Sequence, residues 1–198
     1  MGLPAGTFNW AGPFDPIADP GWQAVQEGRL KERDYWDERA RVFADLTGEP
    51  AQMPRMMAHL YDGSPEEVTR DGARALMADV KAAGIPLGLL TNDMHAFHTQ
   101  QWIATMQPVL SQFDVIVDGS VDGVMKPDPR AFELVCERMG ISPEGTVFID
   151  DLRSNLEGAV SVGMIGVFLD VTDTQPAFDE VRLHLGLTPS SLGDSPLH

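Results

Sequence analysis

One segment of the chain, Val124–Met164, alternates between helix, turn, buried strand and helix, and this alternation most constrains the fold. Asp128 is a favoured N-cap residue, Pro129 suits the first helical position, and Gly140 can end the helix in a left-handed conformation. Residues 146–149 form a short apolar run with β-branched side chains, which is typical of a strand buried on both faces. The segment therefore predicts part of a parallel α/β sheet.

Two adjacent carboxylates, Asp150 and Asp151, follow that strand, and a second helix is expected after them. Ser154 and Glu157 have the spacing of a capping box, and Gly163 is expected to end this helix. Open α/β sheets bind ligands at the carboxyl ends of their strands, so the carboxylate pair lies where a ligand is expected. For an isolated Asp-Asp pair the commoner outcome is structural, with one Asp capping the helix and the other solvated.

The same alternation recurs on both sides of this segment. Strands are expected at 85–91, 113–117, 146–149 and 165–169, and helices at 71–83, 95–110, 129–139, 154–162 and 179–186. Helices that alternate with short apolar strands imply a Rossmann-like parallel sheet with helices on both faces and right-handed crossovers. Residues 64–187 are therefore assigned to one α/β core.

The N-terminal third has a different pattern. Residues 1–21 are rich in glycine and proline, and residues 22–62 carry apolar stripes at helical spacing without any strand signal. Residues 1–63 are therefore expected to form a small helical cap with an incomplete N-terminus. At the other end, residues 188–198 have the composition of a flexible tail.

The net charge of −16 argues against partners that are themselves polyanions, namely nucleic acids and anionic membrane surfaces. An anionic substrate would then need a bound cation or a local basic group to reverse the field. No apolar run approaches the ~18 residues of a membrane span, and the N-terminus lacks the features of a signal peptide, so a cytoplasmic protein is expected. The single cysteine, Cys136, is expected to be a packed core thiol.

Polar side chains gather at the predicted carboxyl ends of the strands. Thr91 and Asn92 follow one strand, Asp150 and Asp151 follow another, and Lys126 lies in a loop between strand and helix. Adjacent carboxylates repel each other unless a cation neutralises them, and Mg²⁺ is bound by one or two carboxylates, waters and phosphate oxygens. Lys126 would add a second positive charge for a phosphoryl group, although a lone loop lysine is more often simply solvated. A second candidate metal site at Asp93, His95 and His98 has helix-like spacing but is more typical of exposed residues without such a role.

The segments LLTND, KPDP and VFIDDLRSNLEGA, in this order and spacing, resemble the haloacid dehalogenase superfamily. The resemblance is to its subfamily with a helical cap after the first strand, which includes phosphatases and haloacid dehalogenases. It covers residues 64–187, and residues 1–62 correspond to most of the cap. It implies a Mg²⁺-dependent phosphatase acting on a small phosphorylated metabolite; a 2-haloacid dehalogenase is the less favoured reading because those enzymes need no metal.

The resemblance also implies roles for the residues at the sheet edge. Thr91 and Lys126 would be catalytic, with Thr91 binding the phosphoryl group and Lys126 pairing with nucleophile and substrate. Asn92 would contact the substrate, and Asp151 would be a Mg²⁺ ligand. Asp150 would be a second ligand or an orienting carboxylate, and Asn155 would hold the loop or a metal-bound water.

The sequence departs from this family at its first strand. Such enzymes open with a buried strand that ends in Asp-x-Asp, and the first Asp is the nucleophile. Asp15 and Asp19 follow no apolar run, and Asp118 and Asp122 are too far apart, so none is a substitute. The first central strand is therefore missing, and its absence predicts either a groove of unpaired backbone or a re-paired sheet.

Three explanations for the missing strand are open. The favoured one is a coding region that starts upstream, the second is a non-catalytic metal- and phosphate-binding module, and the third is a partner that donates the strand by β-augmentation. A homodimer is also left open. In each case the chain from Met1 is expected to show little or no Mg²⁺-dependent phosphatase activity.

Overall fold

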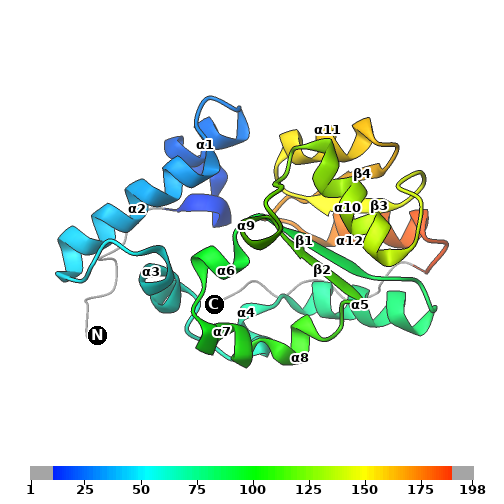
Figure 1. Cartoon of the computed structure of the whole chain (residues 1–198), viewed down its shortest axis with the longest axis horizontal. Coiled ribbons are helices and arrows are strands. Elements are labelled where there is room, and N and C mark those ends of the chain that lie inside the picture. Colours follow the sequence, from blue (N-terminus) through cyan, green and yellow to red (C-terminus); the bar gives the residue numbers. More distant parts are fainter. Residues whose placement is uncertain (1–10, 189–198) are drawn as a thin grey trace.

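The computed structural model of the chain describes residues 11–188, which form a helical N-terminal part and an α/β core (Figure 1). Two short 3₁₀ turns, Gly12–Phe14 and Pro16–Ala18, precede the cap helices α1 (Pro20–Gln26), α2 (Glu32–Thr47) and α3 (Met53–Leu60). Among residues 11–188 no helix is long and apolar enough to cross a membrane. The cap residues before 11 and the tail predicted at 188–198, apart from Thr188, lie outside the described residues.

The core follows as alternating helices and strands. Its elements are α4 (Pro65–Val68), α5 (Asp71–Ala82), β1 (Gly88–Thr91), α6 (Met94–Phe97), α7 (Gln100–Thr105), α8 (Gln107–Leu110), β2 (Val115–Asp118), α9 (Gly119–Asp122), α10 (Pro129–Met139), β3 (Val147–Asp150), α11 (Arg153–Ser161), β4 (Ile165–Phe168) and α12 (Gln175–His184). The single helix expected at 95–110 is wrong. His98 is extended there, and Thr99 then caps a new helix by accepting a hydrogen bond from Trp102 N–H.

The ends of the helices show which local signals were decisive. Asp128 caps α10 by accepting a hydrogen bond from Arg130 N–H, and Gly140 ends α10 with a φ of 69°, as expected. The capping box predicted at Ser154 is wrong, because α11 begins one residue earlier and its N-cap, Leu152, makes no side-chain cap. Asp150 accepts the hydrogen bond from Leu152 N–H instead, at 2.9 Å.

The strands form two separate parallel pairs. β1 pairs with β2 in the register Gly88↔Val115 to Thr91↔Asp118, and β3 pairs with β4 in the register Val147↔Ile165 to Asp150↔Phe168. No strand of residues 11–188 pairs with the remaining edge of β1 or of β3. The α/β class with a helical cap is thus confirmed, and the sheet is interrupted at the position where the first central strand was expected to be missing.

Helices cover both faces of the two strand pairs. On one face α10 packs across both pairs, since the rings of Phe132 on α10 and Phe148 on β3 are 5.1 Å apart and Leu90 of β1 belongs to the same cluster. Cys136 is buried in this cluster with 1% exposure, as expected for a core thiol. On the other face α5 and α12 pack against β3 and β4, burying residues such as Val167, whereas Leu89 of β1 and Ile116 of β2 pack in a cluster with α7 and α8.

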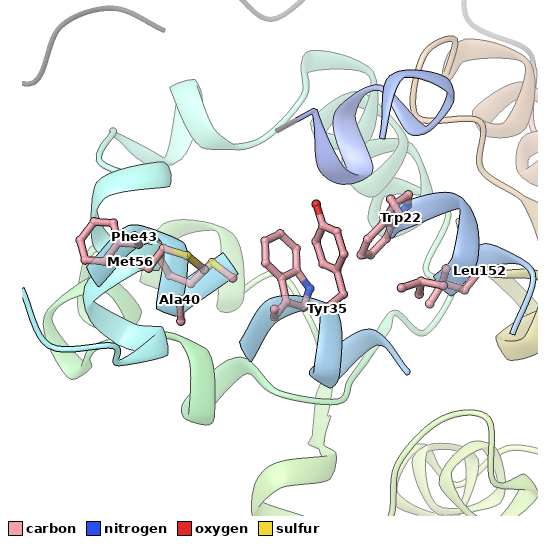
Figure 2. Packing of buried hydrophobic residues seen from close by; sticks show 9 residues of the cluster. Trp22, Tyr35, Ala40, Phe43, Met56 and Leu152 are labelled. Atoms are coloured by element: carbon pink, nitrogen blue, oxygen red, sulfur yellow. The ribbon is translucent and has the colours of Figure 1, made fainter. Parts of the chain in front are cut away.

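The cap has its own aromatic core, which also contacts the α/β part. Figure 2 shows Trp22, Tyr35, Phe43 and Met56 packed together, with Leu152 from the loop after β3 inserted beside Trp22. Because Leu152 directly follows the Asp150–Asp151 pair, this contact seats the cap over the carboxyl ends of the strands. The domain boundary predicted at residues 63 and 64 stays a prediction.

Candidate functional site

The structure brings the sequence-predicted polar residues to one edge of the strand pairs. A cavity of about 420 Å³ lies between the cap and this edge, and four of the six predicted site residues line it: Thr91, Asn92, Lys126 and Asp151. Each follows from local chain geometry, since β1 ends at Thr91, β3 ends at Asp150, and the loop before α10 carries Lys126. Their roles in binding or catalysis stay predictions.

Asp150 is the fixed member of the carboxylate pair. Its Oδ2 accepts a hydrogen bond from Lys126 Nζ at 2.7 Å, and both side chains are largely buried, at 7% and 13% exposure. Its Oδ1 accepts from Leu152 N–H and from Asn155 Nδ2, each at 2.9 Å. Donors thus occupy both oxygens of Asp150, an arrangement that aims the Lys126 ammonium and holds the loop in place. Asn155 is itself buried, which suits the loop-holding role.

Asn92 holds the backbone of Lys126. Its Oδ1 accepts from Lys126 N–H at 2.7 Å, and its Nδ2 donates to the Lys126 carbonyl at 3.1 Å. The Asn92 side chain therefore pairs with Lys126 much as a neighbouring strand would, and its amide is engaged in positioning Lys126. Close packing of α11 holds the same loop, since a Cβ added at Gly158 would lie 2.4 Å from the Pro127 carbonyl oxygen.

Asp151 is the carboxylate that faces the cavity. Burial, together with the adjacent charge of Asp150, raises the pKa of Asp151 to about 6. Within the described part of the chain, no group of three or more His, Cys, Asp or Glu side chains is arranged to hold a metal ion. Mg²⁺ needs one or two protein carboxylates, with waters and substrate oxygens completing its shell, and this requirement fits Asp151 with Asp150 beside it.

Glu32, in the first turn of α2, lines the same cavity and was not identified from the sequence. Burial raises the pKa of Glu32 to about 6; the charges of Asp151 and Asp150 also raise it, while Lys126 lowers it. An acidic residue in the first turn of a helix is common because it complements the helix dipole, so its local sequence carried no functional signal. Glu32 adds to the negative charge that a divalent cation would offset.

Aromatic side chains form another part of the cavity wall, beside aliphatic ones such as Met57 and Leu89. His98 stacks on Trp102 with ring centroids 3.7 Å apart, and Tyr61 meets His98 edge-on. Burial lowers the pKa of His98 to about 4 and raises the pKa of Tyr61 to about 12, so both rings are neutral at pH 7. This wall is therefore uncharged and suited to an organic group rather than to phosphate.

The second candidate metal site does not assemble. Asp93 forms an ion pair with Arg33 of α2, and His95 Nδ1 lies 2.7 Å from Asp118 Oδ2. His98 instead stacks in the aromatic wall. The three residues thus have separate partners, and the hypothesis of a metal site there is wrong for the described structure.

The carboxylates considered as nucleophiles are engaged elsewhere. Asp19 accepts from Trp22 N–H and from the Tyr35 hydroxyl, at 3.0 and 2.9 Å. Asp118 accepts from Ser120 and His95, and Asp122 pairs with Arg138. Asp15 caps a 3₁₀ turn. None of these four residues lines the cavity, which agrees with the expectation that they do not replace the nucleophile.

Comparison with known proteins places these features in context. The family model of the haloacid dehalogenase-like hydrolases matches residues 20–163. The chain is 31% identical over 121 residues to phosphoglycolate phosphatase of Escherichia coli (strain K12), which covers 58% of the chain and 47% of that enzyme. It is 29% identical over 194 residues to acyl-CoA dehydrogenase family member 10 of Mus musculus, which covers 96% of the chain and 17% of that protein. The chain thus spans less than half the length of these curated relatives.

A solved structure agrees with the fold. The HAD phosphatase from Thermococcus onnurineus superposes with a TM-score of 0.57 at 20% identity, covering 85% of this chain and 79% of that one. At this identity the likeness concerns the arrangement of helices and strands, and it supports the α/β core with a helical cap.

Proposed function

This chain belongs to the haloacid dehalogenase-like hydrolase family, and on that premise we propose that its polar strand edge is the metal- and phosphate-binding part of a Mg²⁺-dependent phosphatase site. The observation that carries the proposal is the buried Lys126–Asp150 pair at 2.7 Å, with Asp151 beside it on the cavity. The similarity to phosphoglycolate phosphatase supports a phosphate monoester as substrate. The proposed substrate is a small phosphorylated metabolite.

Each residue would have a distinct task in this site. Asp150 and Asn92 orient Lys126, whose ammonium would stabilise the charge on a phosphoryl group. The Thr91 hydroxyl would donate to a phosphoryl oxygen. Asp151, assisted by Asp150, would hold Mg²⁺, which when bound would neutralise negative charge on the phosphate.

The nucleophile is the missing element of this proposal. The 198 residues contain no apolar strand ending in Asp-x-Asp, so we expect the chain alone to turn over a generic aryl phosphate at the background rate. The measurement is a colorimetric assay with Mg²⁺ on the purified chain. Robust turnover that Asp151→Asn abolishes would overturn this expectation.

Ligand binding is expected to persist without turnover. Mg²⁺ together with inorganic phosphate should raise the melting temperature of the chain, because ligands that bind only the folded state stabilise it. Asp151→Asn should remove this increase, whereas Asp173→Asn, which changes an exposed carboxylate, should leave it intact. An equal increase in the two variants would mean that the cation binds elsewhere.

A second function, a non-catalytic phosphate- and metal-binding module, is favoured by the same absence of a nucleophile. It predicts that Mg²⁺ and phosphate raise the melting temperature both with and without an added strand that ends in Asp-x-Asp. The phosphatase proposal instead predicts that supplying this strand restores Mg²⁺-dependent turnover. Homodimerisation stays a prediction that light scattering would test.

A further inference from the structure

The cavity under the cap is lined by two chemically different sets of residues. One set comprises the candidate phosphate-binding residues Thr91, Lys126 and Asp151. The volume of about 420 Å³ lies within the roughly 300–1,000 Å³ typical of small-molecule sites, so a bound phosphate would leave room for an organic group. The other set could contact that group and is rich in aromatic rings, those of Trp22, Trp36, Tyr61, Phe97, His98 and Trp102.

The basic groups near this cavity are already bound to carboxylates. Lys126 Nζ binds Asp150 at 2.7 Å, and Arg33 pairs with Asp93, which also lines the cavity. His98 is neutral at pH 7, because burial lowers its pKa to about 4. The described lining therefore offers no free cation to an organic group that is itself an anion.

Glu32 is a carboxylate set among the aromatic rings. The Trp36 indole N–H donates a hydrogen bond to Glu32, yet burial raises the pKa of Glu32 to about 6. Burial also raises the pKa of Tyr61, and the charges of Asp151 and Glu32 add to this effect. The carboxylate of Glu32 thus lies close enough to the Tyr61 hydroxyl to act on it.

Glu32 has neither a metal site nor a protein cation to neutralise it. Within residues 11–188, no group of three or more His, Cys, Asp or Glu side chains is arranged to hold a metal ion, so Glu32 does not complete such a site with Asp150 and Asp151. The nearby ammonium of Lys126 is bound to Asp150 instead. Removing a carboxylate from water without a partner is unfavourable, and a cation on the ligand would offset this cost.

The aromatic rings favour the same sign of charge on the ligand. The face of an aromatic ring carries partial negative charge and attracts an ammonium group, most strongly where water is excluded. Trp36 meets Phe97 edge-on with centroids 6.5 Å apart, and Tyr61 meets His98 edge-on at 5.8 Å. An edge-on contact covers one face of only one ring in each pair, so other ring faces stay available. A quaternary ammonium suits such a wall best, because it has no N–H groups that need acceptors.

We propose that the cavity binds the phosphate monoester of a small alcohol that carries a quaternary ammonium group, with the ammonium held between Glu32 and the aromatic rings. The inference deepens the proposed function, on which its phosphate end rests. The ammonium end rests on Glu32 and the aromatic lining alone. A substrate with a carboxylate in place of the ammonium would bring like charge to Glu32 and be rejected.

Two probes of the same shape test this preference for a cation. They are phosphocholine and its uncharged isostere, in which a tert-butyl group replaces the trimethylammonium group. Isothermal titration calorimetry on the 198-residue chain is performed with Mg²⁺ above pH 7, where Glu32 is mostly ionised. Phosphocholine should bind at least about tenfold more tightly than the isostere. Equal binding of the two probes, tighter binding of the isostere, or binding of neither would overturn the proposal.

Two variants of the same helical turn locate the source of the preference. Glu32→Gln keeps the shape of the side chain and removes its charge, so the preference for phosphocholine should fall below about threefold. Asp34→Asn removes an exposed carboxylate from the first turn of α2 and should leave the preference unchanged. The proposal fails if Glu32→Gln keeps the full preference or if the two variants lose it equally. It also fails if Glu32→Gln abolishes the melting-temperature increase with Mg²⁺ and inorganic phosphate, because Glu32 would then serve the metal.

Choline separates this inference from the phosphatase proposal. Without Mg²⁺ or phosphate, a high concentration of choline chloride should raise the melting temperature of the chain relative to potassium chloride, and Glu32→Gln should remove this increase. If choline acts in this way while Mg²⁺ and phosphate have no effect, the proposed function fails and the ammonium site stands. If Mg²⁺ and phosphate raise the melting temperature but the two phosphate probes bind equally, only the ammonium site fails.

Discussion

Replacing Lys126 by methionine tests whether the buried ion pair organises the candidate site. Lys126→Met keeps most of the aliphatic stem, so little cavity forms, and it leaves the Asp150 carboxylate without its cation. Removing one partner of a buried pair typically costs 3–5 kcal/mol. Asp150 keeps its hydrogen bonds from Leu152 and Asn155, which favours the lower end of this range. The lost contact of Lys126 Nζ with the Phe148 ring, 5.6 Å from its centroid, adds about 0.5–1 kcal/mol.

The expected loss in the free energy of unfolding is therefore about 3–4 kcal/mol, or a fall in melting temperature of roughly 10 °C for a chain of this length. Urea denaturation followed by tryptophan fluorescence, in the absence of divalent cations, measures it. The double variant Lys126→Met/Asp150→Asn should recover part of the loss, because it no longer buries an uncompensated charge.

A surface pair provides the control. Arg41 and Glu38 are 3.0 Å apart with 67% and 53% of their side chains exposed, so Arg41→Met should cost less than about 1 kcal/mol. If Lys126→Met costs as little as this control, Lys126 does not hold a buried charge and the description of the site is wrong. If the double variant is less stable than Lys126→Met, the cost does not come from the unpaired carboxylate.

Three further predictions follow from particular residues. Burial raises the pKa of Asp151 to about 6, above its unfolded value of 3.8, so the contribution of Asp151 to stability is lost as pH rises from about 4 to about 6. Above pH 6, Asp151→Asn should therefore be more stable than the unmodified chain by roughly 1–3 kcal/mol. Urea titrations that show no gain in stability at pH 7 would refute this. Gly158→Ala should destabilise α11 by about 1–3 kcal/mol, despite the helix propensity of alanine, because the new Cβ would meet the Pro127 carbonyl oxygen at 2.4 Å; a rise in melting temperature would contradict this packing. Ser64→Ala should lower the free energy of unfolding by about 1 kcal/mol through loss of its capping box, whereas Ser154→Ala should lower it by less than about 0.5 kcal/mol. If thermal unfolding shows equal losses for the two variants, Ser154 does cap α11 and the description of this helix end is wrong.

Local patterns were sufficient to predict the four strands of the core and the ends of α10. The apolar run at 146–149 corresponds to β3, and Asp128 and Gly140 lie at the two ends of α10, as predicted. These predictions succeeded because capping and strand burial depend on a few neighbouring residues. The rule that parallel strands present their carboxyl ends at one edge then brought Thr91, Lys126 and Asp151 to one cavity.

Predictions that depended on the surroundings were less accurate. The helix expected at 95–110 is broken at His98, whose ring stacks on Trp102, and Ser154 is displaced from its capping position because Asp150 already binds the start of α11. In both places a contact outside the local pattern outweighed the local preference.

The sequence by itself determined the α/β class, the four strands and the residue types at their carboxyl ends, because these follow from short-range periodicity and turn chemistry. Only the tertiary structure decided that Glu32 joins Asp151 in the cavity and that Asn92 holds the backbone of Lys126. It also decided that the strands of residues 11–188 form two separate pairs, because β1 and β3 do not pair with each other. These features depend on which distant segments pack together, and no local pattern encodes that packing.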